Sequence, residues 1–306
     1  MPNLRQLEYL VALAETLNFR KAAERTGTTQ PTLSEQLKAL ETRLGAQLVE
    51  RSRSHVLMTP VGEQVVTVAR RMLADAEEIR TLSASGGREL SGVLRLALPP
   101  TIGPYLLPVL IPELQRRFPG LKLYVREDLP SRLIETLLAG RQDLVITPMP
   151  VSEKEVTAEP MFREPLHLTL PHGHRLADQS EIRREDLATE DVLALGQGHQ
   201  LHDAVIALCH DTGARIRLDY EGTSLDTLRE MVAMGLGVTF LPGLYIAAAV
   251  TSEANVVVRT LADRSVSRTI GLAWRAASAR EPRYQDLAQL VQDVIKTNFP
   301  GLPVTG

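Results

Sequence analysis

The sequence predicts an α/β protein with a separate helical domain at its amino terminus, and three observations lead to this prediction. The first fifty residues repeat apolar side chains at three- and four-residue spacing, which is typical of amphipathic helices. One long helical pattern then starts at Pro60 and ends in a stretch rich in serine and glycine at residues 83–87. From Gly92 onward, short apolar strands alternate with helices, which indicates an α/β sheet.

Length and composition limit the class of protein. A chain of 306 residues is long enough for two or three compact units, each with a core of its own. Hydrophobic residues make up 44% and charged residues 23%, as in ordinary globular proteins. A net charge of −3 disfavours a protein that coats nucleic acid without specificity, although it leaves room for a sequence-specific reader. The chain shows neither a signal peptide nor a long apolar run, so we expect a cytoplasmic protein that does not enter a membrane.

The amino-terminal domain is predicted to be a helix-turn-helix. An amphipathic helix over residues 1–17 would support a helix pair in which Ala22 and Ala23 allow close approach and Gly27 makes the turn. The second helix of the pair would be capped by a threonine and would carry a proline in its first turn. We expect one buried leucine stripe on this helix, formed by Leu33, Leu37, Leu40 and Leu44 and ended by Gly45.

The opposite face of this second helix is polar. Short polar side chains at a helix amino terminus can contact base edges and phosphates in a major groove. We expect the residues at the DNA to be Thr28, Thr29, Gln30, Pro31, Thr32, Ser34 and Lys38. The segment 47–59 is predicted to be a two-stranded wing whose Arg51 and Arg53 contact flanking phosphates. The spacing alone is equally compatible with an ordinary antiparallel helix pair.

The long helix from Pro60 is predicted to dimerise. Its apolar stripe would be exposed in a single chain, and it consists of Val61, Val65, Val68, Met72, Ala76 and Ile79. A second copy of the same helix is the simplest partner, and the resulting dimer would place two DNA-binding domains on a near-palindromic operator. The predicted domains are therefore a DNA-binding domain at 1–59, a linker helix and hinge at 60–88, and a regulatory domain at 89–306.

The regulatory domain is predicted to contain two Rossmann-like subdomains, as in periplasmic binding proteins. Strands at 93–98, 121–126 and 144–147 alternate with helices at 105–118 and 132–138, which predicts a parallel sheet. The first subdomain would take residues 89–163 and 268–300, and the second residues 164–267. Shorter strands are expected at 166–170, 192–195, 216–220, 235–241 and 268–274, with helices at 201–210, 225–233 and 284–297. Crossings near 163–166 and 266–269 would leave a cleft between the subdomains as the expected ligand site.

The first ninety residues resemble the LysR-type transcriptional regulators. The resemblance rests on Ala22-Ala23, Thr29-Gln30-Pro31-Thr32-Leu33-Ser34, Leu40-Glu41, Leu44-Gly45 and Thr59-Pro60-x-Gly62. The rest of the chain is similar to the peroxide-sensing OxyR branch of that family, through residues 101–108, Gly198-His199, 223–229 and 237–242. The resemblance implies a homodimer or a homotetramer that binds double-stranded promoter DNA as an activator or a repressor, with RNA polymerase as an expected partner.

The same resemblance makes Gln200 the notable departure. In the OxyR branch a peroxidatic cysteine follows the Gly-His pair, and a resolving cysteine comes several residues later. Here Gln200 stands at the first position, and Cys209, the only cysteine, stands at the second. An amide cannot be oxidised through a sulfenic acid, so the usual disulfide switch is not available within this chain. Pro130 and His202 also differ from the pattern of the branch, whereas Thr101 agrees with it.

The expected effector is a small polar or anionic molecule. Pro100 and Thr101 follow a strand and open a helix whose N–H groups could hold an anion, and Thr223 and Ser224 repeat this arrangement in the second subdomain. His199 and Gln200 complete the expected effector residues. A plain helix cap remains the alternative at both places.

Other functions stay open at this stage. Cys209 lies among apolar residues, which favours an inert thiol, although a one-cysteine redox sensor is an alternative. His199 and His202 could take part in a metal sensor, but we expect neither a resident metal nor a cofactor. A two-lobed enzyme is disfavoured because no nucleophile elbow or phosphate loop is present. A free-standing solute-binding protein would not carry the amino-terminal domain, and a constitutive regulator would need no effector.

Overall fold

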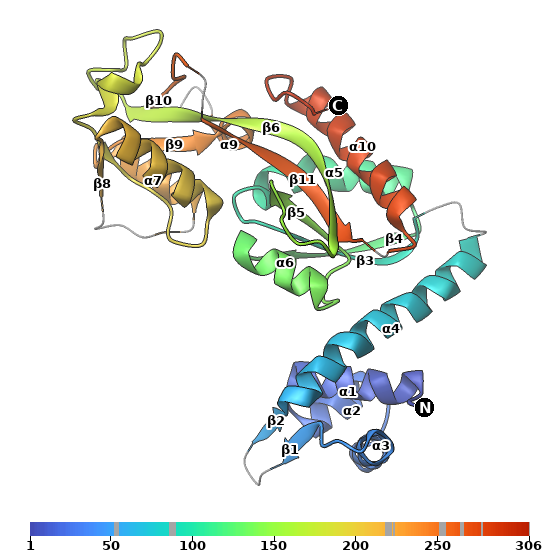
Figure 1. Ribbon diagram of the computed structural model, residues 1–306. Coiled ribbons are helices and arrows are strands. Elements are labelled where there is room, and N and C mark those ends of the chain that lie inside the picture. The colour runs from blue at the N-terminus through green and yellow to red at the C-terminus, as the bar shows by residue number, and fades with distance from the viewer. Residues whose placement is uncertain are drawn as a thin grey trace. The chain divides into compact units, whose positions relative to one another are not determined.

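The chain forms two compact units. The computed structural model describes residues 1–51, 55–85, 90–217, 222, 224–250, 255–263, 266–276 and 278–305. The first unit takes in Met1–Glu89 and the short segment Leu138–Arg141, and the second takes in Leu90–Leu137 and Gln142–Gly306. Figure 1 labels the elements of both units.

The first unit is a winged helix-turn-helix followed by a long helix, as the sequence predicts. Three helices, α1 (Leu4–Thr16), α2 (Phe19–Arg25) and α3 (Gln30–Leu44), precede the antiparallel strands β1 (Val49–Arg51) and β2 (Val56–Met58). Helix α4 (Pro60–Ser85) then runs for 26 residues. One buried cluster joins the three short helices, β1 and α4, and Val56 and Met58 of β2 pack against it. Its buried members are Tyr9, Leu10, Ala12, Leu13, Ala22, Ala23, Leu33, Leu37, Leu40, Leu48, Val49 and Val66.

Local capping explains where α3 begins and ends. The Thr29 hydroxyl accepts the N–H of Thr32 at 3.3 Å, and a proline occupies the first turn. Gly45 ends the helix in the left-handed conformation at φ 66°, and Gly27 makes the preceding turn at φ 62°. The prediction that Leu44 completes the buried stripe is wrong, because this side chain is 39% exposed. It lies in the last turn of α3, beyond the last residue that this helix contributes to the buried cluster.

Contacts between α3, the wing and α4 explain two of the residues that carry the family resemblance. The Glu41 carboxylate accepts the N–H groups of Leu48 and Val49, at 2.9 and 3.0 Å, and so fixes the start of β1. At Gly62, a Cβ atom would lie 2.1 Å from the carbonyl oxygen of Leu48, which only glycine avoids. The Thr59 hydroxyl caps α4 by accepting the N–H of Gly62 at 2.9 Å.

The second unit begins with a lobe that has helices on both faces of its sheet. Strands β3 (Gly92–Leu98), β4 (Leu121–Glu127) and β5 (Leu144–Pro148) are joined by α5 (Gly103–Arg117) and α6 (Pro130–Leu138). Alternate residues of β3 and β5 pack on opposite faces. Leu96 and Ile146 pack with α5 and the final helix α10 (Glu281–Asn298), whereas Ala97 and Val145 pack with α6.

Two long strands connect this lobe to the next one. Strand β6 (Val156–Pro171) pairs antiparallel with β11 (Ser267–Arg275) over the whole length of β11. The predicted crossings near 163–166 and 266–269 therefore lie side by side, with Glu164 opposite Arg268 in the register. Figure 1 shows the two strands running together from one lobe into the other.

The second lobe is built on the far half of β6. Strands β9 (Thr239–Pro242) and β10 (Val256–Arg259) pair antiparallel with β6 on either side. Helices α7 (Gln200–Thr212), α8 (Leu225–Ala233) and α9 (Gly243–Ala249) cover this part of the sheet, together with the short turn η1 (Arg184–Leu187) and the small parallel pair β7 (Asp191–Val192) and β8 (Arg215–Ile216). Their apolar side chains share one buried cluster.

The prediction of a parallel sheet is correct only in part. Strand β3 runs parallel to both β4 and β5, but β6, β9, β10 and β11 pair antiparallel with their neighbours. A helix between strands returns the chain for a parallel pairing, and β6 follows β5 without one. The prediction also placed a strand only at 166–170, where β6 has 16 residues, and it missed α9 and β10.

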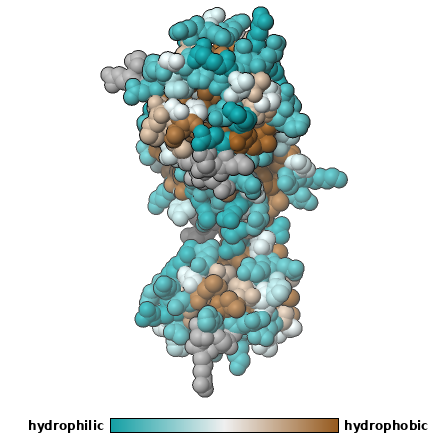
Figure 2. Space-filling model, turned by 90° about the vertical axis from the view of Figure 1, so that its left-hand side faces the viewer, coloured by the Kyte–Doolittle hydropathy of each residue, from teal (hydrophilic) through white to brown (hydrophobic). Residues whose placement is uncertain are grey.

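The exposed face and the helices can be compared with those of membrane proteins. The face in Figure 2 is mostly hydrophilic, with apolar residues in small separate groups. Among the residues that the structure describes, no helix combines the length and the apolarity needed to cross a membrane.

Candidate functional site

The first unit presents the polar face that the sequence predicts on α3. Gln30, Pro31, Thr32 and Lys38 are exposed there, and Ser34 is half-buried. Three of the threonines also have structural partners. The hydroxyls of Thr29 and Thr32 lie 2.8 Å apart, and a hydrogen bond with Thr28 lowers the pKa of Tyr9 in the supporting helix α1.

The wing carries the rest of the expected DNA-binding residues. The backbone of Arg51 ends β1, but its side chain and all of Arg53 lie outside the described residues. His55 is the first described residue after this tip, and it is exposed.

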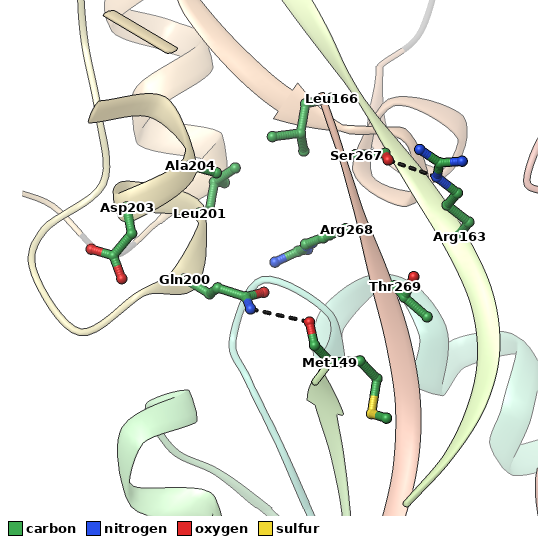
Figure 3. Close-up of a pocket in the computed structure, with 10 residues that line it drawn as sticks. All are labelled: Met149, Arg163, Leu166, Gln200, Leu201, Asp203, Ala204, Ser267, Arg268 and Thr269. Carbon is green, nitrogen blue, oxygen red and sulfur yellow. Dashed lines mark hydrogen bonds between the residues drawn. The ribbon is translucent and has the colours of Figure 1, made fainter. Parts of the chain in front are cut away.

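The second unit contains a pocket of about 540 Å³ beside the two crossing strands. This volume is in the range of pockets that bind metabolites. Figure 3 shows its lining, which comes from the end of β5, from β6 and β11, and from the first turns of α7. The lining residues are Met149, Arg163, Leu166, Gln200, Leu201, Asp203, Ala204, Ser267, Arg268 and Thr269.

The charged centre of this pocket is Arg268. Its side chain is buried and pairs with Glu164, with 2.6 Å between Nε and Oε2. It also donates from Nη1 to the Thr101 hydroxyl at 3.3 Å. Its remaining nitrogen, Nη2, is buried and has no hydrogen-bond partner among the described residues. Arg268 was not among the residues predicted from the sequence, although an arginine in an apolar strand is a signal that a buried partner exists.

Gln200 and His199 lie at the start of α7. The Gln200 side chain lines the pocket and donates from Nε2 to the Met149 carbonyl at 3.4 Å, while its Oε1 is buried without a partner in the described part of the chain. Both ring nitrogens of the buried His199 likewise have no partner there. Burial, helped by the charge of Arg268, lowers the pKa of His199 and keeps the ring neutral near pH 7.

The structure places Pro100 and Thr101 behind the pocket. Thr101 is 1% exposed and reaches the pocket only through its bond to Arg268. The N–H groups of Ile102 and Gly103, which an anion at this helix would have used, both bond to the Pro99 carbonyl. Neither Pro100 nor Thr101 lines the pocket.

The second expected anion site consists of Thr223 and Ser224, and the structure gives Ser224 the role of a helix cap. Ser224 is exposed and caps α8 by accepting the N–H of Thr227 at 3.3 Å. Thr223 lies outside the described residues. In the first turn of α8, Asp226 accepts the phenol of Tyr105 at 3.0 Å and that of Tyr245 at 3.1 Å, so this carboxylate connects α8 with the first lobe.

Cys209 is buried on the inner side of α7. Burial raises the pKa of its thiol to about 11, so the thiol is protonated at neutral pH. His202, one of the proposed metal ligands, donates from Nδ1 to the Leu195 carbonyl at 2.6 Å. Within the described residues, no three His, Cys, Asp or Glu side chains are grouped as metal ligands would be.

Comparison with known proteins covers both units. The bacterial regulatory helix-turn-helix protein, lysR family, matches residues 4–63, and the LysR substrate binding domain matches residues 87–296. The chain is 39% identical to the DNA-binding transcriptional dual regulator OxyR of Escherichia coli K12 over 298 residues, which are 97% of each chain. The chain belongs to the LysR family of bacterial transcriptional regulators. It is a DNA-binding regulator of the OxyR-like group and not an enzyme.

Solved structures agree with this membership of the LysR family. A full-length OxyR from Pseudomonas aeruginosa, with aspartate in place of a cysteine, has a TM-score of 0.83 and 36% identity, and the match covers 99% of this chain and 97% of that one. A Corynebacterium glutamicum OxyR with a cysteine-to-serine change and H2O2 bound has a TM-score of 0.67 and 28% identity over 98% and 94% of the two chains.

In this LysR-family regulator, an amide side chain lines the pocket where a reactive thiol would be expected. Gln200 lies on the pocket wall at the position where the resemblance to the OxyR branch implies a peroxidatic cysteine. Cys209 is in the same helix, but it packs in the apolar cluster of the second lobe. The residues around Gln200 can bind a polar molecule, and none of the pocket-lining residues can be oxidised to a disulfide.

Proposed function

We propose that this regulator activates or represses transcription from its operator in response to a small polar or anionic effector that binds beside Gln200. The observation that supports this proposal is the lining of the pocket, where a buried guanidinium N–H and a buried amide oxygen have no partner among the described residues. Such groups cost free energy unless a ligand or water satisfies them. Relatives of this chain are named as activators of hydrogen peroxide-inducible genes, and this favours activation over repression.

On the DNA side, the proposal assigns two roles. Residues of α3 and of the turn before it contact the operator, with Gln30 and Ser34 at base edges, and Arg51 and Arg53 contact flanking phosphates. The full set on the α3 side is Thr28, Thr29, Gln30, Pro31, Thr32, Ser34 and Lys38. Thr28 and Thr29 also position α3, through Tyr9 and Thr32. We further propose a cytoplasmic homodimer or homotetramer, paired through α4, that contacts RNA polymerase. The domain limits at 59 and 88 belong to the same proposal.

Operator variants would test the division of roles at the DNA. Replacing Gln30 with alanine should change the preference among operator sequences, because a lost base contact costs about 1–3 kcal/mol at one base pair only. Replacing Arg53 with alanine should weaken binding to every sequence alike and reduce the slope of log K against log salt by about 0.9. Fluorescence anisotropy with matched operators at several salt concentrations measures both effects.

The control and the contrary result are simple. Gln289→Ala, on the exposed face of α10 in the other unit, should leave both affinity and preference unchanged. If Gln30→Ala and Arg53→Ala lower the affinity for all operators by the same factor and leave the salt slope unchanged, the assigned roles are wrong.

A further inference from the structure

We propose that the pocket beside Gln200 selects a short carboxylate with a hydrogen-bond donor on the neighbouring carbon, as in a 2-hydroxy acid. This inference rests on the proposed function, since it names the chemical class of its effector. Three features of the pocket support it: an unpaired guanidinium N–H, an unpaired amide oxygen, and a lining that contains apolar side chains and a second arginine.

The guanidinium of Arg268 requires an acceptor. The residue is 8% exposed, and two of its three nitrogens are engaged by Glu164 and Thr101. These bonds hold the planar group in place, so the direction of the free Nη2 N–H bonds is fixed as well. A carboxylate oxygen is the acceptor that forms the strongest bond with a guanidinium.

The pocket lining must also balance the negative charge of a bound carboxylate. Glu164 already balances the charge of Arg268, so a bound anion needs another cation. Arg163 lies on the pocket wall, where its Nε donates to Ser267 at 2.7 Å. The acidic lining residue, Asp203, lies on the opposite side of the pocket in Figure 3. In Figure 3 the guanidinium of Arg268 is directed toward Gln200, whereas that of Arg163 lies beside Ser267, on the other side of β11. The place for the carboxylate is therefore the free N–H of Arg268, and Arg163 adds a positive charge to the lining without bonding the ligand there.

The amide of Gln200 requires a donor. Because its NH2 group faces the Met149 carbonyl, its oxygen must be the atom without a partner. Figure 3 shows the side chains of Gln200 and Arg268 directed into the same space between α7 and β11. A molecule that accepts from Arg268 and donates to Gln200 satisfies both groups, and a hydroxyl next to a carboxylate does so.

The remaining lining sets the size and polarity of the ligand. Leu166, Leu201 and Ala204 offer an apolar wall for a short carbon chain. A pocket of about 540 Å³ is also larger than peroxide or phosphate needs. Neither of those molecules has an apolar part, and peroxide has no charge, so both should bind more weakly than an organic acid.

Isothermal titration calorimetry of the full chain with three probes tests the proposal. Lactate has both groups, propionate lacks the hydroxyl, and lactamide lacks the charge. We expect lactate to bind about tenfold more tightly than propionate, because the Gln200 oxygen stays unsatisfied with propionate, and we expect no saturable binding of lactamide. Hydrogen peroxide and inorganic phosphate should not compete with lactate.

Two variants of one residue separate the contributions. Gln200→Leu should abolish the preference for lactate over propionate but keep propionate binding. Gln200→Glu should weaken both acids by more than about tenfold, because it places a like charge in the pocket. Gln289→Leu, the same change on the exposed surface of α10, is the matched control and should behave as the parent.

Several results would overturn the carboxylate proposal. They are lactamide binding as tightly as lactate, Gln200→Leu keeping the preference for lactate, and the absence of any binding of the two acids. Operator binding, measured on the same samples, separates this failure from that of the proposed function. A protein that binds its operator, but not these acids, contradicts only the carboxylate class, whereas one that binds no operator contradicts the regulator itself.

Discussion

At the scale of single residues, Arg268 links three distant parts of the chain. It lies on β11 and pairs with Glu164 on β6 and with Thr101 before α5. Glu164 is fully buried, and its other oxygen accepts the N–H of Leu244 at 2.9 Å. A buried pair of this kind costs desolvation, and the cost is offset only when the remaining lone pairs and protons are bonded. A hydrogen bond to the free N–H of Arg268 should therefore contribute most to the free energy of ligand binding.

Cys209 allows a prediction at the same scale. Because burial raises the pKa of its thiol to about 11, the reactive thiolate is scarce at pH 8. We expect iodoacetamide to modify the native protein at least about a hundredfold more slowly than the protein unfolded in urea, and the rate to rise steeply between about pH 8 and pH 10 as the thiolate forms. Mass spectrometry of timed samples measures the modification.

The same residue answers the redox alternative. Peroxide should leave the DNA footprint unchanged, and Cys209→Ser should behave as the parent does. A footprint that shifts with peroxide in the parent, but not in Cys209→Ser, would instead establish a one-cysteine sensor.

The residues also show what the sequence could and could not predict about the site. The exposed face of α3 was predictable, because helical spacing and the Thr29 cap are local. Gln200 was found through family resemblance, and the structure places it on the pocket wall. Arg268 was missed because its partners are separated from it by 104 and 167 residues, and no local pattern contains that information.

At the scale of elements, local signals predicted helices better than strands. Helix α8 has the predicted limits, 225–233, because Ser224 caps it and its apolar spacing is regular. Strand β6 was predicted only over 166–170, because its first half is a strand through pairing with β11, about a hundred residues later. Pairing partners so distant in sequence leave no mark on composition or spacing.

At the same scale, we predict that helix α4 dimerises through its exposed apolar residues. Val61, Val68, Met72 and Ile79 are 46%, 45%, 46% and 66% exposed, so four of the six residues of the predicted apolar stripe are exposed in the described chain, whereas Val65 packs against the core of the first unit. Pairing with a second α4 would bury the exposed residues. Replacing Val68 or Met72 with glutamate should raise the dimer dissociation constant by at least about tenfold, since each change removes apolar burial from both copies.

Sedimentation equilibrium measures this effect on α4. Gln64→Glu, which adds the same charge at an exposed position of α4 outside the stripe, should leave the dimer unchanged. Equal weakening by Gln64→Glu and Met72→Glu would mean that charge alone, and not the stripe, controls association.

At the scale of the whole molecule, the chain has one core in the first unit and separate cores in the second. The cluster of the first unit contains only residues from 9 to 66, whereas the two large clusters of the second unit contain only residues from 90 onward. The two lobes of the second unit are connected by β6 and β11, by the Glu164–Arg268 pair and by the bonds of Asp226 with Tyr105 and Tyr245. The second unit should therefore fold as one body.

The last prediction follows from this separation of the cores. A fragment of residues 90–306 should unfold in a single cooperative transition and bind lactate as the full chain does, because every residue that lines the pocket lies within it. It should not bind the operator, since α3 and the wing are missing. Circular dichroism during heating, calorimetry with lactate and anisotropy with the operator measure these three properties. The fragment keeps every pocket residue and every contact between the two lobes. If it nevertheless unfolds without a cooperative transition, the second unit depends on the first for its stability.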